Sequence, residues 1–257
     1  MTLGLSECCR LFACDALLGA PPVPPDGYTP DVQDLEAEMS RLGISTSVVR
    51  HRACLDANGH FGNLVLMEEI AGHSGLIPAW FVTPDGYEPD FAPEALVDRM
   101  LAAGVRLAWT DPAAQDFSLQ PWCSGRLLSA LQERRVPLLL RYSAAPLSDL
   151  HQALEAYPQL RTILLDVPRY GRNRPLEALL ALHPHLYLCF GPSFSVHEGF
   201  RDLVSRYGQE RWVWGAGYPS YEGGAAIAGL AYSGLSASEM EAVAHLNMER
   251  LLAEVEV

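Results

Sequence analysis

Short apolar segments alternate with longer amphipathic segments along the chain. The apolar segments are rich in Val, Ile, Leu and aromatic residues and show little alternation with polar ones. Such segments are typical of parallel strands that are covered on both faces. The pattern predicts eight strands, at residues 11–14, 47–50, 76–82, 105–109, 136–141, 162–167, 186–190 and 212–215.

The amphipathic segments between these strands predict helices. A Thr-Pro-Asp sequence at 29–31 is typical of an N-cap followed by proline at the first helical position, and Gly43 marks the end of that helix. An Ala-Pro-Glu sequence at 92–94 predicts a second start, with the end at Gly104. Ser238, with a glutamate three residues later, has the spacing of a capping box. Further helices are expected at residues 125–135, 148–157, 175–183, 197–207 and 238–254.

Eight strands that alternate with helices in 257 residues predict a (β/α)8 barrel, in which the active site lies at the C-terminal ends of the strands. The rival fold is a doubly wound open sheet, which usually has a glycine-rich turn after its first strand. The corresponding turn here, at residues 18–22, contains two prolines and is poorly suited to phosphate binding. No linker, charge block or repeat divides the sequence, so we expect residues 1–257 to form a single domain.

The composition narrows the classes of partner and chemistry. The formal net charge is −13, which disfavours nucleic acid and anionic membranes as partners. All 18 basic residues are arginine, so lysine Schiff-base chemistry and a carbamylated-lysine metal bridge are excluded. The six cysteines, with no secretory signal pattern and no apolar run near the roughly 20 residues of a membrane span, predict free thiols in a cytoplasmic protein. Homo-oligomer formation is left open.

The first predicted strand carries a family resemblance. Residues 12–19 read F-A-C-D-A-L-L-G and have the shape of an F-D-x-H-x-H-x-G opening. With six further fragments in the expected order, the chain resembles the amidohydrolase-related family, which comprises metal-dependent TIM-barrel hydrolases and decarboxylases of small carboxylated or cyclic molecules. Those fragments are residues 35–44, 104–106, 136–140, 157–164, 210–219 and 247–252.

The resemblance also locates the positions of the family's metal ligands. Two histidines from strand one, one each from strands five and six, and an aspartate from strand eight correspond to Asp15, Leu17, Arg141, Asp166 and Gly217. None of these positions keeps its family residue. Arginine cannot bind a cation, and leucine and glycine offer no ligand atom. We therefore expect no metal cofactor. Were a zinc-like divalent ion present, it would lie near the two aspartates.

Four residues at predicted strand ends are candidates for catalysis. We expect Asp15 and Asp166 to flank Arg141 at the barrel mouth, where the guanidinium could replace the metal by polarising a carbonyl or carboxylate. The alternative is a structural salt bridge in a disused site. His51 is a candidate general base, or else a hydrogen-bonded structural residue.

Five further side chains are candidates for substrate binding. Arg169 and Arg172 belong to the only dense basic cluster in the sequence, which would attract an anion or form a solvated loop. Trp109, Tyr142 and Tyr218 could line a pocket, with aromatic packing as the alternative.

Three classes of function follow from these observations. The first is a metal-free hydrolase or lyase that acts on a small, carboxylated organic molecule at the barrel mouth. The second is a non-catalytic protein that binds a small anion in the same pocket. The third is a scaffold without a ligand. An open pocket lined by the two aspartates and Arg141 would favour the first two classes, whereas a filled mouth would favour the third.

Overall fold

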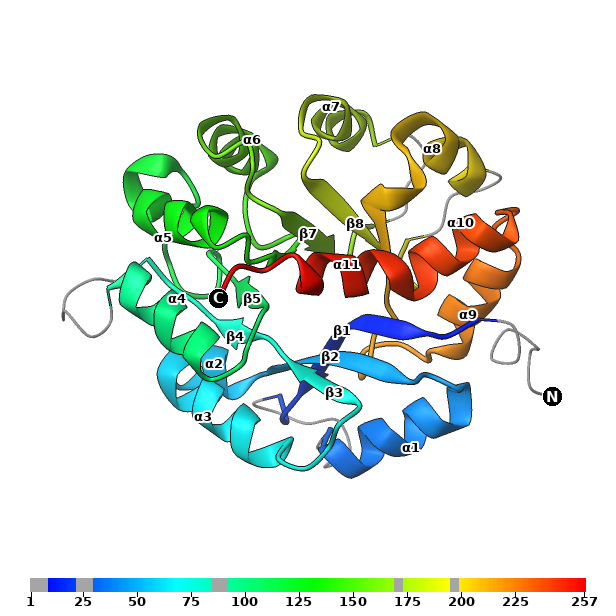
Figure 1. The fold of residues 1–257 in the computed structure, drawn as a ribbon, viewed down its shortest axis with the longest axis horizontal. Coiled ribbons are helices and arrows are strands. Elements are labelled where there is room, and N and C mark those ends of the chain that lie inside the picture. Colours follow the sequence, from blue (N-terminus) through cyan, green and yellow to red (C-terminus); the bar gives the residue numbers. More distant parts are fainter. Residues whose placement is uncertain (1–8, 22–29, 85–91, 169–172, 195–198) are drawn as a thin grey trace.

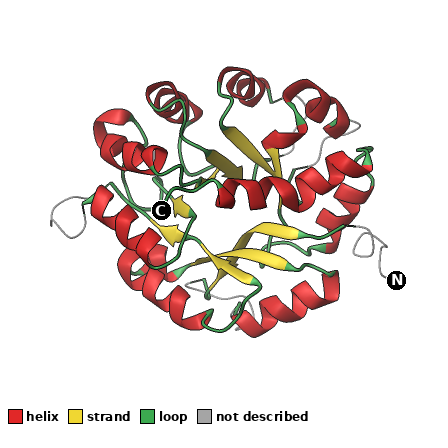
Figure 2. Ribbon diagram, viewed as in Figure 1, coloured by secondary structure: helices red, strands yellow, loops and turns green. Residues whose placement is uncertain are grey.

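The computed structural model describes residues 9–21, 30–84, 92–168, 173–194 and 199–257. Its strands lie at the centre of the molecule and its helices surround them (Figures 1 and 2). All the paired strands run parallel. The strands are β1 (Phe12–Leu18), β2 (Thr46–His51), β3 (Leu76–Pro78), β4 (Trp80–Phe81), β5 (Ala108–Thr110), β6 (Leu138–Arg141), β7 (Thr162–Leu165), β8 (Leu186–Phe190) and β9 (Trp212–Trp214).

The strands follow one another around the sheet in chain order, as β1-β2-β3 and β4-β5-β6-β7-β8-β9. The division falls at Ala79, where the chain changes its hydrogen-bonding partner. Ala79 N donates to Val49 O at 2.9 Å, and Trp80 N donates to Leu107 O at 2.9 Å. Residues 76–81 therefore act as one barrel strand that pairs with β2 first and with β5 afterwards. The predicted (β/α)8 barrel is confirmed, although the single predicted strand at 76–82 is two short ones.

Helices form the outer layer of the barrel (Figure 2). They are α1 (Val32–Leu42), α2 (Ala53–Asp56), α3 (Gly59–Glu69), α4 (Pro93–Ala102), α5 (Pro121–Glu133), α6 (Leu147–Ala156), α7 (Arg174–Leu182), α8 (Phe200–Tyr207), α9 (Gly224–Ala231), α10 (Ala237–Glu241) and α11 (Asn247–Ala253). A π-helical turn at Ala242–Leu246 joins the last two.

Two predicted helix starts need correction. The N-cap of α1 is Asp31, whose side chain accepts a hydrogen bond from Asp34 N at 2.9 Å, whereas the predicted cap at residue 29 lies outside the described residues. The capping box belongs to Ser236 and Glu239, two residues before the predicted pair. Both N-caps were misplaced for the same reason. Several side chains that could accept the capping hydrogen bond lie near the start of each helix, and the backbone geometry determines which of them is the cap.

The core has two parts. An inner cluster fills the barrel with side chains such as Phe12, Cys14 and Leu139, and α11 adds Met248 and Leu251 to it. A larger cluster lies between the strands and the outer helices. Cys14, Cys54, Cys123 and Cys189 are free thiols, as predicted. No helix in the described ranges has the length and hydrophobicity needed to span a membrane.

Candidate functional site

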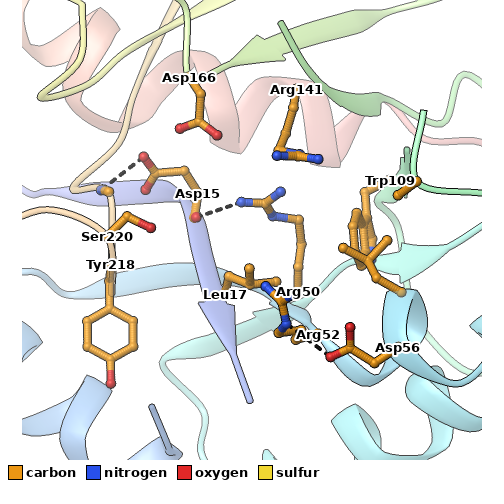
Figure 3. A pocket seen from close by; sticks show the side chains of 13 residues that line it. Asp15, Leu17, Arg50, Arg52, Asp56, Trp109, Arg141, Asp166, Tyr218 and Ser220 are labelled. Atoms are coloured by element: carbon orange, nitrogen blue, oxygen red, sulfur yellow. Dashed lines mark hydrogen bonds and ion pairs between the residues drawn. The ribbon is translucent and has the colours of Figure 1, made fainter. Parts of the chain in front are cut away.

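A cavity of about 470 Å³ lies toward the C-terminal ends of the strands. Its walls come from strands on opposite sides of the barrel, so it is the barrel mouth predicted to hold the site (Figure 3). Charged side chains dominate its lining. The lining residues are Asp15, Leu17, Arg50, Arg52, Leu55, Asp56, Trp109, Ala114, Arg141, Asp166, Gly217, Tyr218 and Ser220.

Asp15 is held at the floor of the cavity by the chain that follows β9. Its Oδ1 accepts a hydrogen bond from Ala216 N at 3.0 Å, and its Oδ2 accepts one from Gly217 N at 3.0 Å. The pairing of β1 with β2 is irregular between Ala13 and Ala16, so the backbone departs from regular pairing where Asp15 lies. A side chain at Gly215 would place its Cβ 2.2 Å from Asp15 Oδ2, so glycine is required there.

The protonation of Asp15 is shifted toward the physiological range. Its side chain is buried, with 6% of its surface exposed. Burial is the main cause that raises its pKa from 3.8 to about 6, and the negative charge of Asp166 acts in the same direction. The hydrogen bonds from Gly217 and Ala216 and the charge of Arg50 oppose this rise. Asp15 can therefore exchange a proton near neutral pH.

Arg50 is a buried cation that forms no ion pair with a carboxylate in the described part of the chain. Only 4% of its surface is exposed. Its Nη2 donates to the backbone oxygen of Asp15 at 2.8 Å, its guanidinium carbon lies 5.5 Å from the centre of the Trp109 ring, and its Nε has no hydrogen-bond partner. Burial lowers its pKa, while the charges of Asp166 and Asp15 oppose that change. Arg50 was not among the site residues predicted from the sequence. Alternation from Val48, which faces the barrel interior, would have pointed to it.

Arg141 has a different partner from the one predicted. Its Nε donates to Asp111 Oδ2 at 2.7 Å, and its Nη2 bonds to the same oxygen. Asp111 is fully buried, and its Oδ1 accepts a hydrogen bond from Ala114 N at 3.1 Å. Arg141 forms no ion pair with Asp15 or Asp166, so the expected pairing of its guanidinium with these two carboxylates is wrong, although all three residues line the cavity. Asp111 follows β5, which pairs with β6, so it is the carboxylate on the neighbouring strand.

Asp166 lines the cavity as an exposed carboxylate directly after β7. Its φ of 52° lies in the left-handed region, which aspartate tolerates better than most residues and which recurs at functional sites. Among the described residues, Asp166 has no hydrogen-bond or ion-pair partner. Figure 3 shows its carboxylate directed toward that of Asp15.

His51 is not brought together with the other candidates. Its Nε2 lies 3.3 Å from Glu69 Oε2 of α3, and its Nδ1 accepts a hydrogen bond from Ala53 N at 3.1 Å. It follows Arg50 on β2, so its side chain faces the helices rather than the barrel interior. Burial lowers its pKa, and Glu69 opposes that change.

The substrate-binding candidates divide into three groups. Trp109 and Tyr218 line the cavity as expected. Tyr142 does not, because it packs against the outer core and its hydroxyl accepts a hydrogen bond from Asn173 Nδ2 at 3.1 Å. Arg169 and Arg172 lie outside the described residues.

Comparison with known proteins identifies the family of this barrel. The amidohydrolase family model matches residues 15–253, which is most of the chain. The chain therefore belongs to the amidohydrolase family. No curated protein matches its sequence.

Solved structures of decarboxylases share the fold. A 2,6-dihydroxybenzoate decarboxylase from Rhizobium is 16% identical with a TM-score of 0.73, and the match covers 95% of this chain and 99% of that one. The 5-carboxyvanillate decarboxylase LigW from Sphingomonas paucimobilis is 13% identical with a TM-score of 0.70, over 95% and 99%. A dihydroxybenzoic acid decarboxylase from Polaromonas sp. JS666, with bound manganese and the inhibitor 2-nitroresorcinol, is 13% identical with a TM-score of 0.70, over 95% and 97%.

The bound manganese of that neighbour raises the question whether this cavity fits a divalent ion. Both oxygens of Asp15 already accept backbone hydrogen bonds, Leu17 and Gly217 carry no ligand atom, and Arg141 is cationic. Within the described ranges, no group of three or more His, Cys, Asp or Glu side chains could hold a metal ion. These residues do not form the ligand set that a catalytic divalent ion requires.

Proposed function

We propose that the cavity binds a small carboxylated organic molecule and that the protein is a metal-free hydrolase or lyase. The observation that carries this proposal is Arg50, a cation buried in the cavity wall that forms no ion pair with any carboxylate of the described residues. Removing an ion from water costs several kcal/mol, and the charges of Asp166 and Asp15 offset that cost for Arg50 only in part. An anionic ligand would supply the missing partner, because a carboxylate matches the donor geometry of a guanidinium.

The residues around Arg50 support a chemical step as well as binding. Arg141 contributes a second positive charge that is held in place by Asp111, and 37% of its side chain is exposed. Fixed charges of this kind stabilise negative charge that develops on a carbonyl or carboxylate oxygen. Asp15, with its pKa raised to about 6, would transfer the proton. As a lyase, the protein would deliver this proton to the carbon that loses the carboxylate.

The three decarboxylases of the same fold favour the lyase over the hydrolase, because each of them is named for a carboxylated aromatic substrate. Trp109 in the cavity wall is suited to contact such a planar ring. A non-catalytic protein that binds a small anion is the second candidate, because the unpartnered Arg50 accounts for binding without turnover. A cavity lined by Asp15, Asp166 and Arg141 supports both candidates over a pure scaffold.

A single substitution tests the anion site. We expect the wild-type protein to bind hydroxylated benzoates in calorimetric titrations, and Arg50→Met to lose this binding by about tenfold or more, the scale of a charge-assisted hydrogen bond. Arg126→Met is the matched control, because Arg126 pairs with Glu94 on the surface. Release of carbon dioxide from the same compounds separates the lyase from the binding protein. Equal binding by Arg50→Met and wild type would overturn the proposal.

A further inference from the structure

The cavity contains two opposite charges that have no hydrogen-bonded ion-pair partner among the described residues. Arg50 is buried with an unpartnered Nε, and Asp166 presents a carboxylate with no hydrogen bond or ion pair among the described residues. Other charged groups of the lining are already compensated. Arg52 Nε bonds to Asp56 Oδ2 at 3.0 Å, and Arg141 bonds to Asp111.

Separate contacts hold the side chains of Arg50 and Asp166 in place. Arg50 is fixed by the carbonyl oxygen of Asp15 and by the ring of Trp109. Asp166 is fixed by a left-handed backbone at the end of β7. They do not form an ion pair with each other, although the charge of Asp166 is the largest that opposes the lowering of the Arg50 pKa. In Figure 3 the carboxylates of Asp15 and Asp166 face the cavity on one side of the guanidinium groups of Arg50 and Arg141.

We propose that the ligand is a zwitterion whose carboxylate binds Arg50 and whose ammonium group binds Asp166. The inference rests on the proposed function, because it assumes that Arg50 binds a carboxylate. A ligand with both charges would compensate both residues at once, whereas a simple carboxylate would add a third negative charge to those of Asp15 and Asp166. A second carboxylate in place of the ammonium group would be repelled by the same two aspartates.

Matched ligands test the ammonium contact separately from the carboxylate contact. The 3- and 4-(aminomethyl)benzoates are zwitterions, the corresponding methylbenzoates lack the ammonium group, and benzylamine lacks the carboxylate. We expect at least one zwitterionic isomer to bind the wild-type protein about tenfold more tightly than its methylbenzoate counterpart, as a charge-assisted hydrogen bond would give. Benzylamine should bind more weakly than that isomer, because it has no carboxylate to bind Arg50.

Asp166→Asn removes the charge and nearly preserves the shape of the side chain. We expect it to abolish the preference for the zwitterion and to retain binding of the methylbenzoate. Asp98→Asn, which changes an exposed aspartate of α4 paired with Arg134, is the matched control and should keep the preference. Circular dichroism of each variant verifies that it is folded.

The outcomes distinguish this inference from the proposed function. If the methylbenzoates bind through Arg50 and neither zwitterion binds more tightly, the zwitterion proposal fails and the carboxylate site stands. A preference that survives in Asp166→Asn also overturns it, because another group must then bind the ammonium. If no benzoate binds the wild-type protein, the proposed function itself fails.

Discussion

At the scale of single residues, the two arginines of the cavity differ in what compensates their charge. Arg141 has a buried carboxylate partner in Asp111, and its own side chain is 37% exposed. Arg50 is buried and has only a backbone carbonyl, an aromatic ring and longer-range charges around it. We therefore expect Arg50 to lower the stability of the fold and to be retained because it binds the ligand.

The first prediction concerns this cost. Arg50→Met keeps most of the side-chain volume and removes the uncompensated charge, so we expect the free energy of unfolding to rise by about 1 to 3 kcal/mol while benzoate binding is lost. Urea denaturation monitored by circular dichroism measures the change. Arg126→Met should leave stability nearly unchanged, because exposed ion pairs contribute little. A less stable Arg50→Met protein would show that the arginine is a structural element of the barrel.

The second prediction concerns the pH dependence that Asp15 gives to stability. Its pKa is raised from 3.8 to about 6 in the folded protein, so the folded state holds this proton more tightly than the unfolded chain does. The associated stability is fully present below pH 3.8 and is lost as the pH rises through 6. The unfolding free energy of the wild type should therefore fall by about 3 kcal/mol relative to Asp15→Asn across that window. A difference that does not vary with pH would contradict the raised pKa.

Part of the site could be predicted from the sequence and part could not. Strand ends and the family motif located Asp15, Asp166 and Arg141 at the barrel mouth, and all three line the cavity. The partner of Arg141 was missed, because both strands beside β6 are followed by an aspartate, Asp111 after β5 and Asp166 after β7, and the sequence does not show which of the two the guanidinium contacts. Alternation along β2 distinguishes Arg50 from His51, but the position at the strand end favoured His51, which does not line the cavity.

At the scale of elements, the strands were easier to predict than the helices. Apolar runs locate buried strands because both faces of each strand are covered. The apolar residues of helices α3 and α9 do not follow a clear helical spacing, so neither helix was predicted. Phe61 and Leu64 on α3 are exposed although apolar, and α9 consists entirely of small or apolar residues. The change of hydrogen-bonding partner at Ala79 was not predicted, because the residues of 76–81 are apolar on both sides of it.

The third prediction concerns the contact between β1 and the chain after β9. Gly215→Ala would place a methyl group 2.2 Å from Asp15 Oδ2 and 2.6 Å from Cys189 Sγ. One of these buried groups must move, so we expect a loss of about 1 to 3 kcal/mol in stability together with loss of benzoate binding. The matched control is Gly229→Ala on α9, whose methyl group would lie 3.7 Å from Phe190 and should be neutral or stabilising. Thermal unfolding and calorimetry measure the two effects. Retained binding in Gly215→Ala would show that the position of Asp15 is not needed.

At the scale of the whole molecule, the chain has the barrel of its family, and we expect the residues at the barrel mouth to set its chemistry. Membership of the amidohydrolase family rests on a match over residues 15–253, and the fold is shared with decarboxylases over 95% of the chain. The five positions where metal ligands were expected contain two carboxylates, one guanidinium and two residues without ligand atoms. The barrel determines where a reaction can take place, and the side chains at its mouth determine which reaction.

The fourth prediction is that the purified protein neither carries nor requires a divalent metal. The cavity lining has three arginines and three aspartates, so an added divalent ion would meet no excess of negative charge and an incomplete ligand set. We expect elemental analysis to find far less than one equivalent of zinc or manganese, and EDTA or added Mn²⁺ to leave the melting temperature and benzoate binding unchanged. An ion that binds the folded state alone would raise the melting temperature, so the thermal measurement reports on metal binding independently of activity. About one equivalent of metal, with binding lost on chelation and restored on readdition, would contradict the assignment of the positive charge to arginine. If Asp15→Asn and Asp166→Asn each lowered that metal content, the two aspartates would be identified as its ligands.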